Sequence, residues 1–261
     1  MSNIQRKKLV CFLGEIINNE MKPTATGFFI SIKDFNFIAT SKHVVFNNKT
    51  SSLIDEKLHF FTVSKIAGQT YTKSISAIKK LGNVNWIFHS NKDVDIAIMP
   101  VNIEWSKADL LRVPMEQFVG IDKLLELDDL YYLSYQPGII EKNKVDPIIR
   151  TGSISKINKD KTFFIDGFAF PGNSGSPVFF KKRYFKSDNP PLPGSLIGII
   201  GSHITYQDVA ISSQTKRPRI IFEENTGLSK VWSVDFLKEI IKSTEFSNQL
   251  EKVKKLNSPK K

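Results

Sequence analysis

The sequence predicts an all-β protein with a helix at its C-terminal end. Short runs rich in Val, Ile and Phe recur along most of the 261 residues, and turn residues separate them. Their partial alternation of apolar and polar residues is typical of half-buried strands. Helical signals are few, and the clearest of them lies near the C-terminus.

The expected strands fall into two groups. They are 9–13, 26–32, 36–40, 58–63, 84–89 and 95–101 in the first group, and 130–134, 148–153, 162–166, 177–180, 195–204 and 219–222 in the second. The mixed segment 106–118 indicates a connector between them, and the polar, proline-rich segment 181–193 indicates a loop. Many short strands with spaced turn signals predict barrels or sandwiches.

The helix is expected over Val234–Val253, with Ser233 as its N-cap. Phe236, Ile240 and Ile241 share one face of that helix. The lysine-rich residues 252–261 after it are expected to form a frayed terminus.

Composition narrows the class of protein. Hydrophobic residues at 41% and charged residues at 24% are ordinary for a soluble globular chain. Cys11 is the single cysteine, which excludes an internal disulfide and favours a reducing compartment. The apolar run 9–13 is too short for a signal peptide, and no run is long enough to cross a membrane. We therefore expect a cytoplasmic location and no membrane partner.

The net charge of +11 raises the question of a nucleic-acid partner. No arginine cluster or aromatic–basic motif accompanies the charge. A solvated, lysine-rich surface is the favoured explanation, and we expect no specific nucleic-acid binding.

The strongest local signal is the segment 170–178, FPGNSGSPV. Gly172 and Gly175 flank Ser174 and are able to take positive φ, which exposes a nucleophile on a tight turn. The amides of Gly172 and Ser174 are then candidates for an oxyanion hole. A Gly/Ser loop without chemistry is the alternative, but the full G-N-S-G-S-P run followed by an apolar strand favours a nucleophile.

A serine nucleophile needs a base, and the chain has four histidines. His43 follows directly on the apolar strand 37–40, which places an imidazole just past a strand end. His59 and His89 lie inside strand-like runs and are expected to be surface or core residues. His203 ends another predicted strand.

The base in turn needs a carboxylate to orient it. Asp95 leads directly into a buried-type strand, and Asp93 lies two residues before it. Taken alone, either aspartate is more often a cap of a turn or strand, so the residues themselves leave the choice open.

Together these segments resemble trypsin-like serine peptidases. His43, Asp95 and Ser174 occur in the family's order, separated by 52 and 79 residues. The similarity is closest to the bacterial branch that includes HtrA-like proteases and glutamyl endopeptidases. It rests on TGFFI at 26–30, ATSKHVV at 39–45, DIAIMPV at 95–101 and GNSGSPVFF at 172–180, and it extends to 150–154, 164–170, 196–201 and 225–228.

The resemblance implies two packed six-stranded antiparallel β-barrels of the chymotrypsin-like type, with a His43, Asp95 and Ser174 triad in the cleft between them. The implied divisions are an N-terminal barrel at 1–105, a connector at 106–125, a C-terminal barrel at 126–228, and a helix with its tail at 229–261. The family pattern favours Asp95 over Asp93. It implies a serine endopeptidase that acts on polypeptide substrates without a metal or organic cofactor.

One departure from the family concerns activation. Digestive-type relatives carry an aspartate before the serine, which pairs with a new N-terminal amine after zymogen cleavage. Here that position is Asn173, which cannot make that ion pair, so we expect activity without N-terminal processing.

Specificity is also implied by the alignment. The substrate-binding residues are expected to be Phe168, Ala169, Ile200, Gly201, Ser202 and His203. Phe168 stands where relatives that cleave after Arg or Lys have an aspartate, so a basic P1 residue would be buried without a counter-charge. We expect a small or medium apolar P1 residue, and His203 keeps an acidic P1 residue as the alternative.

Two other functions compete with the peptidase. A catalytically silent barrel would serve as a binding scaffold, and fold alone does not separate it from an enzyme. A nucleic-acid-binding protein rests on charge alone. The presence of all three triad residue types in their segments favours the enzyme. The sequence is also compatible with a regulatory partner, which it does not identify.

Overall fold

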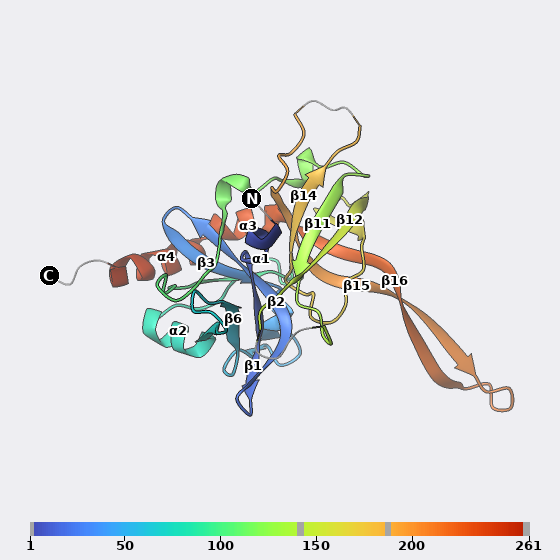
Figure 1. Ribbon diagram of the computed structural model, residues 1–261. Helices are drawn as coiled ribbons and strands as arrows, with labels where there is room; N and C mark the ends of the chain where they lie inside the picture. The colour runs from blue at the N-terminus through green and yellow to red at the C-terminus, as the bar shows by residue number, and fades with distance from the viewer. Residues whose placement is uncertain (1–2, 140–143, 186–188, 258–261) are drawn as a thin grey trace.

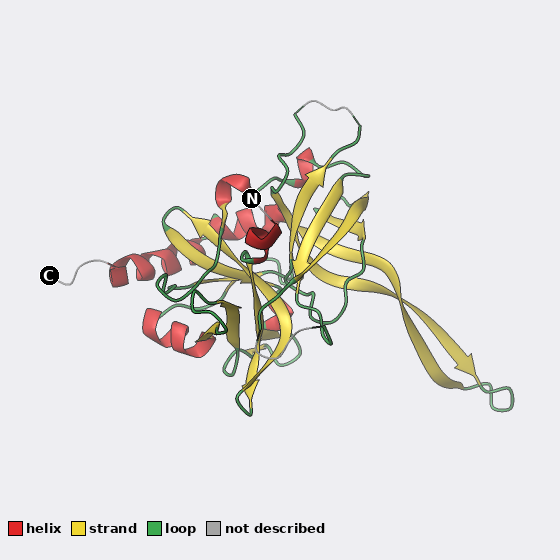
Figure 2. Ribbon diagram, in the orientation of Figure 1, coloured by secondary structure: helices red, strands yellow, loops and turns green. Residues whose placement is uncertain are grey.

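The computed structural model describes residues 3–139, 144–185 and 189–257 (Figure 1). Strands are the main regular structure of the chain, and helices follow them at the C-terminal end (Figure 2). The predicted all-β class with a C-terminal helical segment is confirmed. Residues 186–188 of the predicted loop and 258–261 of the predicted tail lie outside the described residues.

The N-terminal unit is one sheet of eight strands. Seven of them follow the order β7-β6-β1-β2-β3-β9-β8, and β10 pairs beside β2. The strands are β1 (Val10–Ile17), β2 (Glu20–Ile32), β3 (Phe35–Thr40), β6 (His59–Val63), β7 (Thr70–Ser74), β8 (Ile87–Phe88), β9 (Ala97–Pro100) and β10 (Val113–Pro114). A short hairpin of β4 (Phe46–Asn47) and β5 (Ser52–Leu53) lies outside this sheet. A helix, α1 (Asn3–Lys7), precedes β1.

The two-unit architecture agrees with the predicted chymotrypsin-like double barrel, but strand pairing in this first unit is open where a closed six-stranded barrel was expected. Among the described residues its ladder ends at β7 and β8. The helix α2 (Ile75–Gly82) occupies the connection between these strands, and β8 is only two residues long, so little backbone is left for a closing ladder. The segment 106–125 is not only a connector, because β10 within it pairs in parallel with β2. Two 3₁₀ turns, Met115–Gln117 and Ile121–Lys123, make up much of the rest.

The C-terminal unit is a closed barrel of six strands, as predicted, in the order β11-β12-β13-β16-β15-β14. Its strands are β11 (Asp129–Ser134), β12 (Ile148–Ile157), β13 (Thr162–Asp166), β14 (Pro177–Lys182), β15 (Leu196–Ile211) and β16 (Pro218–Ser233). Apolar side chains such as Tyr132, Phe163 and Val178 fill it and are fully buried. Since β16 continues to Ser233, the barrel passes the predicted boundary at 228.

The two units share an apolar core. Phe28 and Ile98 of the N-terminal sheet belong to the same buried cluster as Leu133 and Phe179 of the barrel. Two further clusters fill the units themselves. Because close-packed interiors resist deformation, this shared core holds the facing strand ends of the units in a fixed relation.

Two helices take the place of the single predicted C-terminal helix. They are α3 (Val234–Ile241) and α4 (Thr244–Asn257). The helix breaks because Ser243 caps a new one, its Oγ accepting the amide of Phe246 at 3.1 Å. Phe246 then stacks on Phe37 at 5.0 Å between ring centroids, which fastens α4 to the shared core. No helix in the described parts of the chain is both long and apolar enough to span a membrane.

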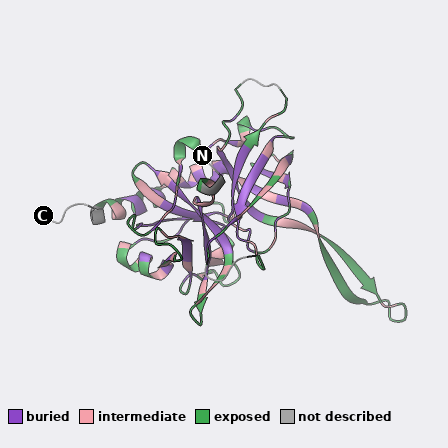
Figure 3. Ribbon diagram, viewed as in Figure 1, coloured by how far each residue is buried: buried purple, intermediate pink, exposed green. Residues whose placement is uncertain are grey.

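The strands β15 and β16 are much longer than the predicted strands at 195–204 and 219–222. Beyond the barrel they continue as a projecting hairpin, which Figure 3 shows as exposed along its length. Sequence patterns missed this extension because neither of its faces is buried, so no one-sided alternation marks it.

Candidate active site

His43 lies where the chain leaves β3. The last four residues of β3 are buried, and the chain then turns through the short 3₁₀ helix Lys42–Val44. That turn presents the His43 side chain, which is 47% exposed. Before it, Ser41 Oγ donates to the carbonyl of Ile200 at 3.1 Å, so the histidine turn is tied directly to β15 of the other unit.

Asp95 contacts His43 through both carboxylate oxygens. Oδ2 lies 2.7 Å from His43 Nδ1, and Oδ1 accepts the backbone amide of His43 at 2.9 Å. The pairing of Thr40 with Ala97 between β3 and β9 brings the two residues together. Asp93 is exposed, and its amide donates to Asn91 Oδ1 at 3.0 Å. Asp95 is therefore the aspartate that holds the imidazole.

This contact changes the protonation of His43. Partial burial lowers its pKa, but the hydrogen bond that His43 donates to Asp95 and the charge of that carboxylate together raise it by more. The net pKa of His43 therefore lies above the ordinary histidine value. An imidazole in this setting accepts a proton more readily than a free one.

The Ser174 segment consists of two consecutive turns. The amide of Asn173 donates to the carbonyl of Phe170 at 2.9 Å, and that of Ser176 donates to Asn173 at 3.0 Å. Gly172 has φ 100° and Gly175 has φ 83°, the positive values expected from the sequence. A Cβ at Gly175 would lie 2.2 Å from the Thr26 carbonyl oxygen, so both backbone conformation and space require glycine there.

The amides of this segment differ in their partners. Those of Asn173, Gly175 and Ser176 all donate to carbonyls. Among the described residues, the amides of Gly172 and Ser174 donate to no protein group. Two unengaged N–H groups beside a half-buried serine are what an oxyanion hole needs.

Thr26, in β2, joins the Ser174 segment to the N-terminal sheet. It is fully buried. Its amide donates to the Ser174 carbonyl at 3.0 Å, and its Oγ1 donates to the Gly172 carbonyl at 2.8 Å. The same Oγ1 accepts the amide of Tyr135 at 2.8 Å. Thr40, at the end of β3, donates its hydroxyl to the Thr26 carbonyl at 2.8 Å. One threonine thus links the serine turn to the strand that leads to His43.

Sequence reasoning missed this role of Thr26. The residue opens the TGFFI segment, but a threonine at the edge of an apolar strand is ordinary. Its partners lie 109 and 146 residues away at Tyr135 and Gly172, so no local pattern marks them.

Asn173 is held inside the C-terminal unit. Its Oδ1 accepts the Phe170 amide at 2.9 Å, and its Nδ2 donates to the Tyr135 carbonyl at 2.5 Å. The side chain is fully buried. Asn173, which stands in place of the zymogen aspartate, therefore finds hydrogen-bond partners for its side-chain amide within the C-terminal unit.

The predicted substrate-binding residues form two groups. Ala169 is buried, and its carbonyl accepts Asn225 Nδ2 at 2.7 Å, which fastens the segment before the serine to β16. Phe168 is 48% exposed, and its ring lies 3.3 Å from where a Cβ of Gly227 would be. The second group, Ile200, Gly201, Ser202 and His203, lies on β15 and pairs with β16 as far as Ser229. β16 therefore connects the two groups.

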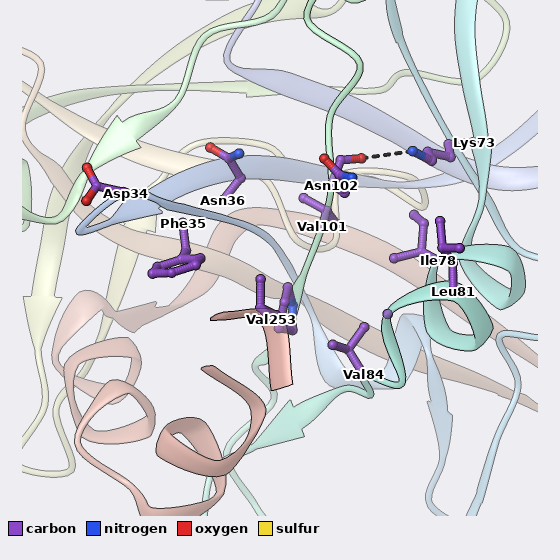
Figure 4. Close-up of a pocket in the computed structure, with 12 residues that line it drawn as sticks. Asp34, Phe35, Asn36, Lys73, Ile78, Leu81, Val84, Val101, Asn102 and Val253 are labelled. Atoms are coloured by element: carbon purple, nitrogen blue, oxygen red, sulfur yellow. Dashed lines mark hydrogen bonds between the residues drawn. The ribbon is translucent and has the colours of Figure 1, made fainter. Parts of the chain in front are cut away.

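Two cavities lie at opposite ends of β3 and β9. One of about 320 Å³ is lined by His43 and Asp95, together with Lys42, Asn48 and the segment 92–94. The other, about 270 Å³, lies at the far ends of the strands beside Phe35 and Val101 (Figure 4). There Lys73 Nζ donates to the Asn102 carbonyl at 3.0 Å.

His59 and His89 have structural partners. His59 lies in β6, and its Nδ1 contacts the Lys57 carbonyl at 3.0 Å. His89 Nε2 lies 2.8 Å from Glu239, which links the end of β8 to α3. The described residues contain no group of three or more His, Cys, Asp or Glu placed to hold a metal ion.

Known proteins share the fold of this chain. Among solved structures, the chain is similar to the thermostable serine protease AL20 from an extremophilic microorganism, with a TM-score of 0.55 and 9% identity over 90% of this chain and 96% of that one. It is also similar to a serine endoprotease from Yersinia pestis, with a TM-score of 0.51 and 14% identity over 97% of this chain and 67% of that one. At such identities the similarity shows a shared fold.

In sequence, no curated protein matches the chain. The family model of the trypsin-like peptidase domain matches residues 25–183. That range is more than half of the chain, and it contains His43, Asp95 and Ser174. The protein therefore belongs to the family of trypsin-like peptidase domains.

Proposed function

We propose that the protein is a serine endopeptidase with Ser174 as nucleophile, His43 as general base and Asp95 as the orienting carboxylate. The observation that carries this proposal is the 2.7 Å contact of Asp95 with His43. The turn that holds Ser174 is joined through Thr26 to Thr40, at the end of the strand that leads to His43. Nucleophile, base and orienting group then come from two units that a shared core holds together.

The proposed reaction passes through an acyl-enzyme. Ser174 Oγ attacks the scissile carbonyl carbon while His43 Nε2 takes its proton, and Asp95 stabilises the imidazolium. The amides of Gly172 and Ser174 receive the developing oxyanion. The C–N bond breaks as His43 protonates the leaving amine. Water, deprotonated by His43, then releases the acyl group and restores Ser174.

A fluorophosphonate probe tests the proposal on the full-length chain. We expect one probe per molecule, attached to Ser174. The intact mass of the labelled protein should include the N-terminal residues. His43→Ala should lose the labelling. Labelling of Ser174→Ala at the wild-type rate would contradict the assignment. A silent scaffold would label in neither form.

The same intact mass tests activation. The buried hydrogen bonds of Asn173 to Phe170 and Tyr135 support a serine segment that is already in its working conformation. We propose that no N-terminal cleavage is needed. Labelling confined to molecules that have lost their first strand would overturn this part of the proposal.

Thr26→Val should reduce kcat about 100-fold with little change in KM. The substitution keeps the shape of the side chain but removes the hydroxyl bonds to the Gly172 carbonyl and the Tyr135 amide, which position the serine turn. Displacement of a reacting group by about 1 Å costs roughly this much. Steady-state kinetics on a peptide substrate measure the split. Thr24→Val is the matched control, because the Thr24 hydroxyl bonds the Leu13 carbonyl, at 3.4 Å, and no other group of the described residues. Equal losses in both variants would argue against a positioning role.

The S1 pocket is expected to accept a small or medium apolar P1 residue such as Val, Ala or Leu. Phe168 lies over Gly227 and stacks on Phe170 at 6.1 Å between centroids, so aromatic carbon takes up space on this side of the pocket. A P1-varied peptide library measures the preference. We expect Phe168→Ala to move it toward larger apolar residues.

Two outcomes would contradict the apolar assignment. Preferred cleavage after Arg or Lys would refute the prediction of an apolar S1 pocket, because Phe168 offers no counter-charge to a basic P1 residue. Cleavage after Glu that is lost in His203→Ala would support the acidic alternative instead.

A further inference from the structure

Residues 205–225 form an arm that projects from the barrel (Figures 1 and 3). β15 and β16 pair along it from Thr205 with Asn225 to Ile211 with Pro218. The neighbouring strands stop earlier, since β14 reaches only Ile199 and β13 only Leu228. In the described parts of the chain, both edges and both faces of the arm are therefore uncovered.

The middle of the arm is apolar on both faces. Directly paired residues share a face, so Val209 and Ile221 lie on one face, and Ala210 and Ile220 on the other. Ile211 and Ile221 are each 62% exposed. A two-stranded hairpin is marginally stable alone, and open edges with apolar faces favour pairing with another strand. The open edges and apolar faces of the arm therefore favour a partner that covers them.

Acidic and basic residues lie at opposite ends of the arm. Its root carries the acidic residues Asp208, Glu223 and Glu224, and its tip carries the basic residues Lys216, Arg217 and Arg219. These three acidic and three basic charges cancel, although the chain as a whole has a net charge of +11. The arm is thus a neutral segment, with its acidic and basic ends on either side of an apolar middle, on a basic protein.

We propose that the arms of two copies of this chain pair antiparallel to form a two-fold dimer. When the β16 edges pair about Ile221, Arg219 of each arm lies opposite Glu223 of the other, and the apolar middles are buried together. This is the self-complementary arrangement that a two-fold interface requires. A parallel pair would bring like charges together. An acidic peptide partner would use the tip but would be repelled by the root.

Sedimentation velocity of the full chain tests the dimer. The tip variant Arg217→Glu/Arg219→Glu and the root variant Asp208→Lys/Glu223→Lys should each weaken the dimer at least about tenfold, because each sets like charges against one another. Mixed in equal amounts, the two variants should form a dimer with one copy of each, since both of its contacts are again between opposite charges. Lys57→Glu/Lys80→Glu, which changes two exposed lysines far from the arm, should dimerise like the wild type.

The mixture of the tip and root variants gives the decisive test of the dimer. A monomeric wild type at every concentration, or variants that stay monomeric when mixed, would overturn the proposal. Dimers that persist in both variants would place the interface elsewhere. Unchanged melting temperatures of the separate variants exclude misfolding as the cause of their dissociation. The result is independent of peptidase activity, since no substituted residue lies in the proposed triad or pocket.

Discussion

Ser174→Ala should lower the rate of peptide hydrolysis about 10⁴-fold or more and leave the fold intact. The substitution removes the attacking oxygen, while the unengaged amides of Gly172 and Ser174 remain to support a small residual rate. Turnover of a peptide substrate measures the loss, and circular dichroism measures the fold.

Ser176→Ala is the matched control for this experiment. Ser176 lies two residues further along the same segment, and its Oγ is buried without a partner among the described residues. Removing that hydroxyl should leave activity close to the wild-type level and should not destabilise the fold, because no hydrogen bond is lost. Comparable losses in the two variants would show that the segment is sensitive to any substitution and would remove the case for Ser174 as nucleophile.

Asp95→Asn should cost on the order of 10⁴ in turnover, because an amide at that position favours the wrong tautomer of His43. Asp93→Asn should cost little, since the Asp93 side chain is exposed and the His43 ring is held by Asp95. Steady-state kinetics on the two variants give the ranking. The reverse ranking would show that the catalytic carboxylate was wrongly chosen.

The same substitution should lower the pKa of His43. In the wild type, the hydrogen bond to Asp95 and the charge of Asp95 outweigh the opposing effect of burial, so the pKa of His43 lies above the ordinary histidine value. Because the base must be neutral to act, kcat/KM of the wild type should rise with pH through that raised pKa, and the rise should move to lower pH in Asp95→Asn. NMR titration of His43 in a Ser174→Ala background measures the shift directly.

The raised pKa also has a consequence for stability. The charged pair of His43 and Asp95 stabilises the folded state fully below the ordinary histidine pKa, where the imidazole is protonated in both folded and unfolded chains. That contribution is lost as pH rises through the raised pKa. The free energy of unfolding should therefore depend less on pH across this window in Asp95→Asn than in the wild type.

The sequence by itself determined the features that depend on neighbours along the chain. His43 follows the apolar β3 and Asp95 precedes the apolar β9, so each could be placed at a strand end from local pattern alone. The positive φ values of Gly172 and Gly175 followed from the glycine spacing around Ser174. The closed C-terminal barrel followed from the family resemblance of these same segments.

Tertiary structure alone decided the features that join distant residues. Pairing of β3 with β9 brings Asp95 against His43, a choice that the residues themselves left open and that only the family resemblance favoured. Thr26 binds a carbonyl 146 residues away, which no pattern predicted. Among the described residues the N-terminal ladder ends at β7 and β8, and β8 has only two residues with which to pair. The arm escaped prediction because both of its faces are exposed, so burial imposed no alternation on its residues. Local pattern records which face of a strand is buried, and it carries no record of contacts that form only when distant segments meet.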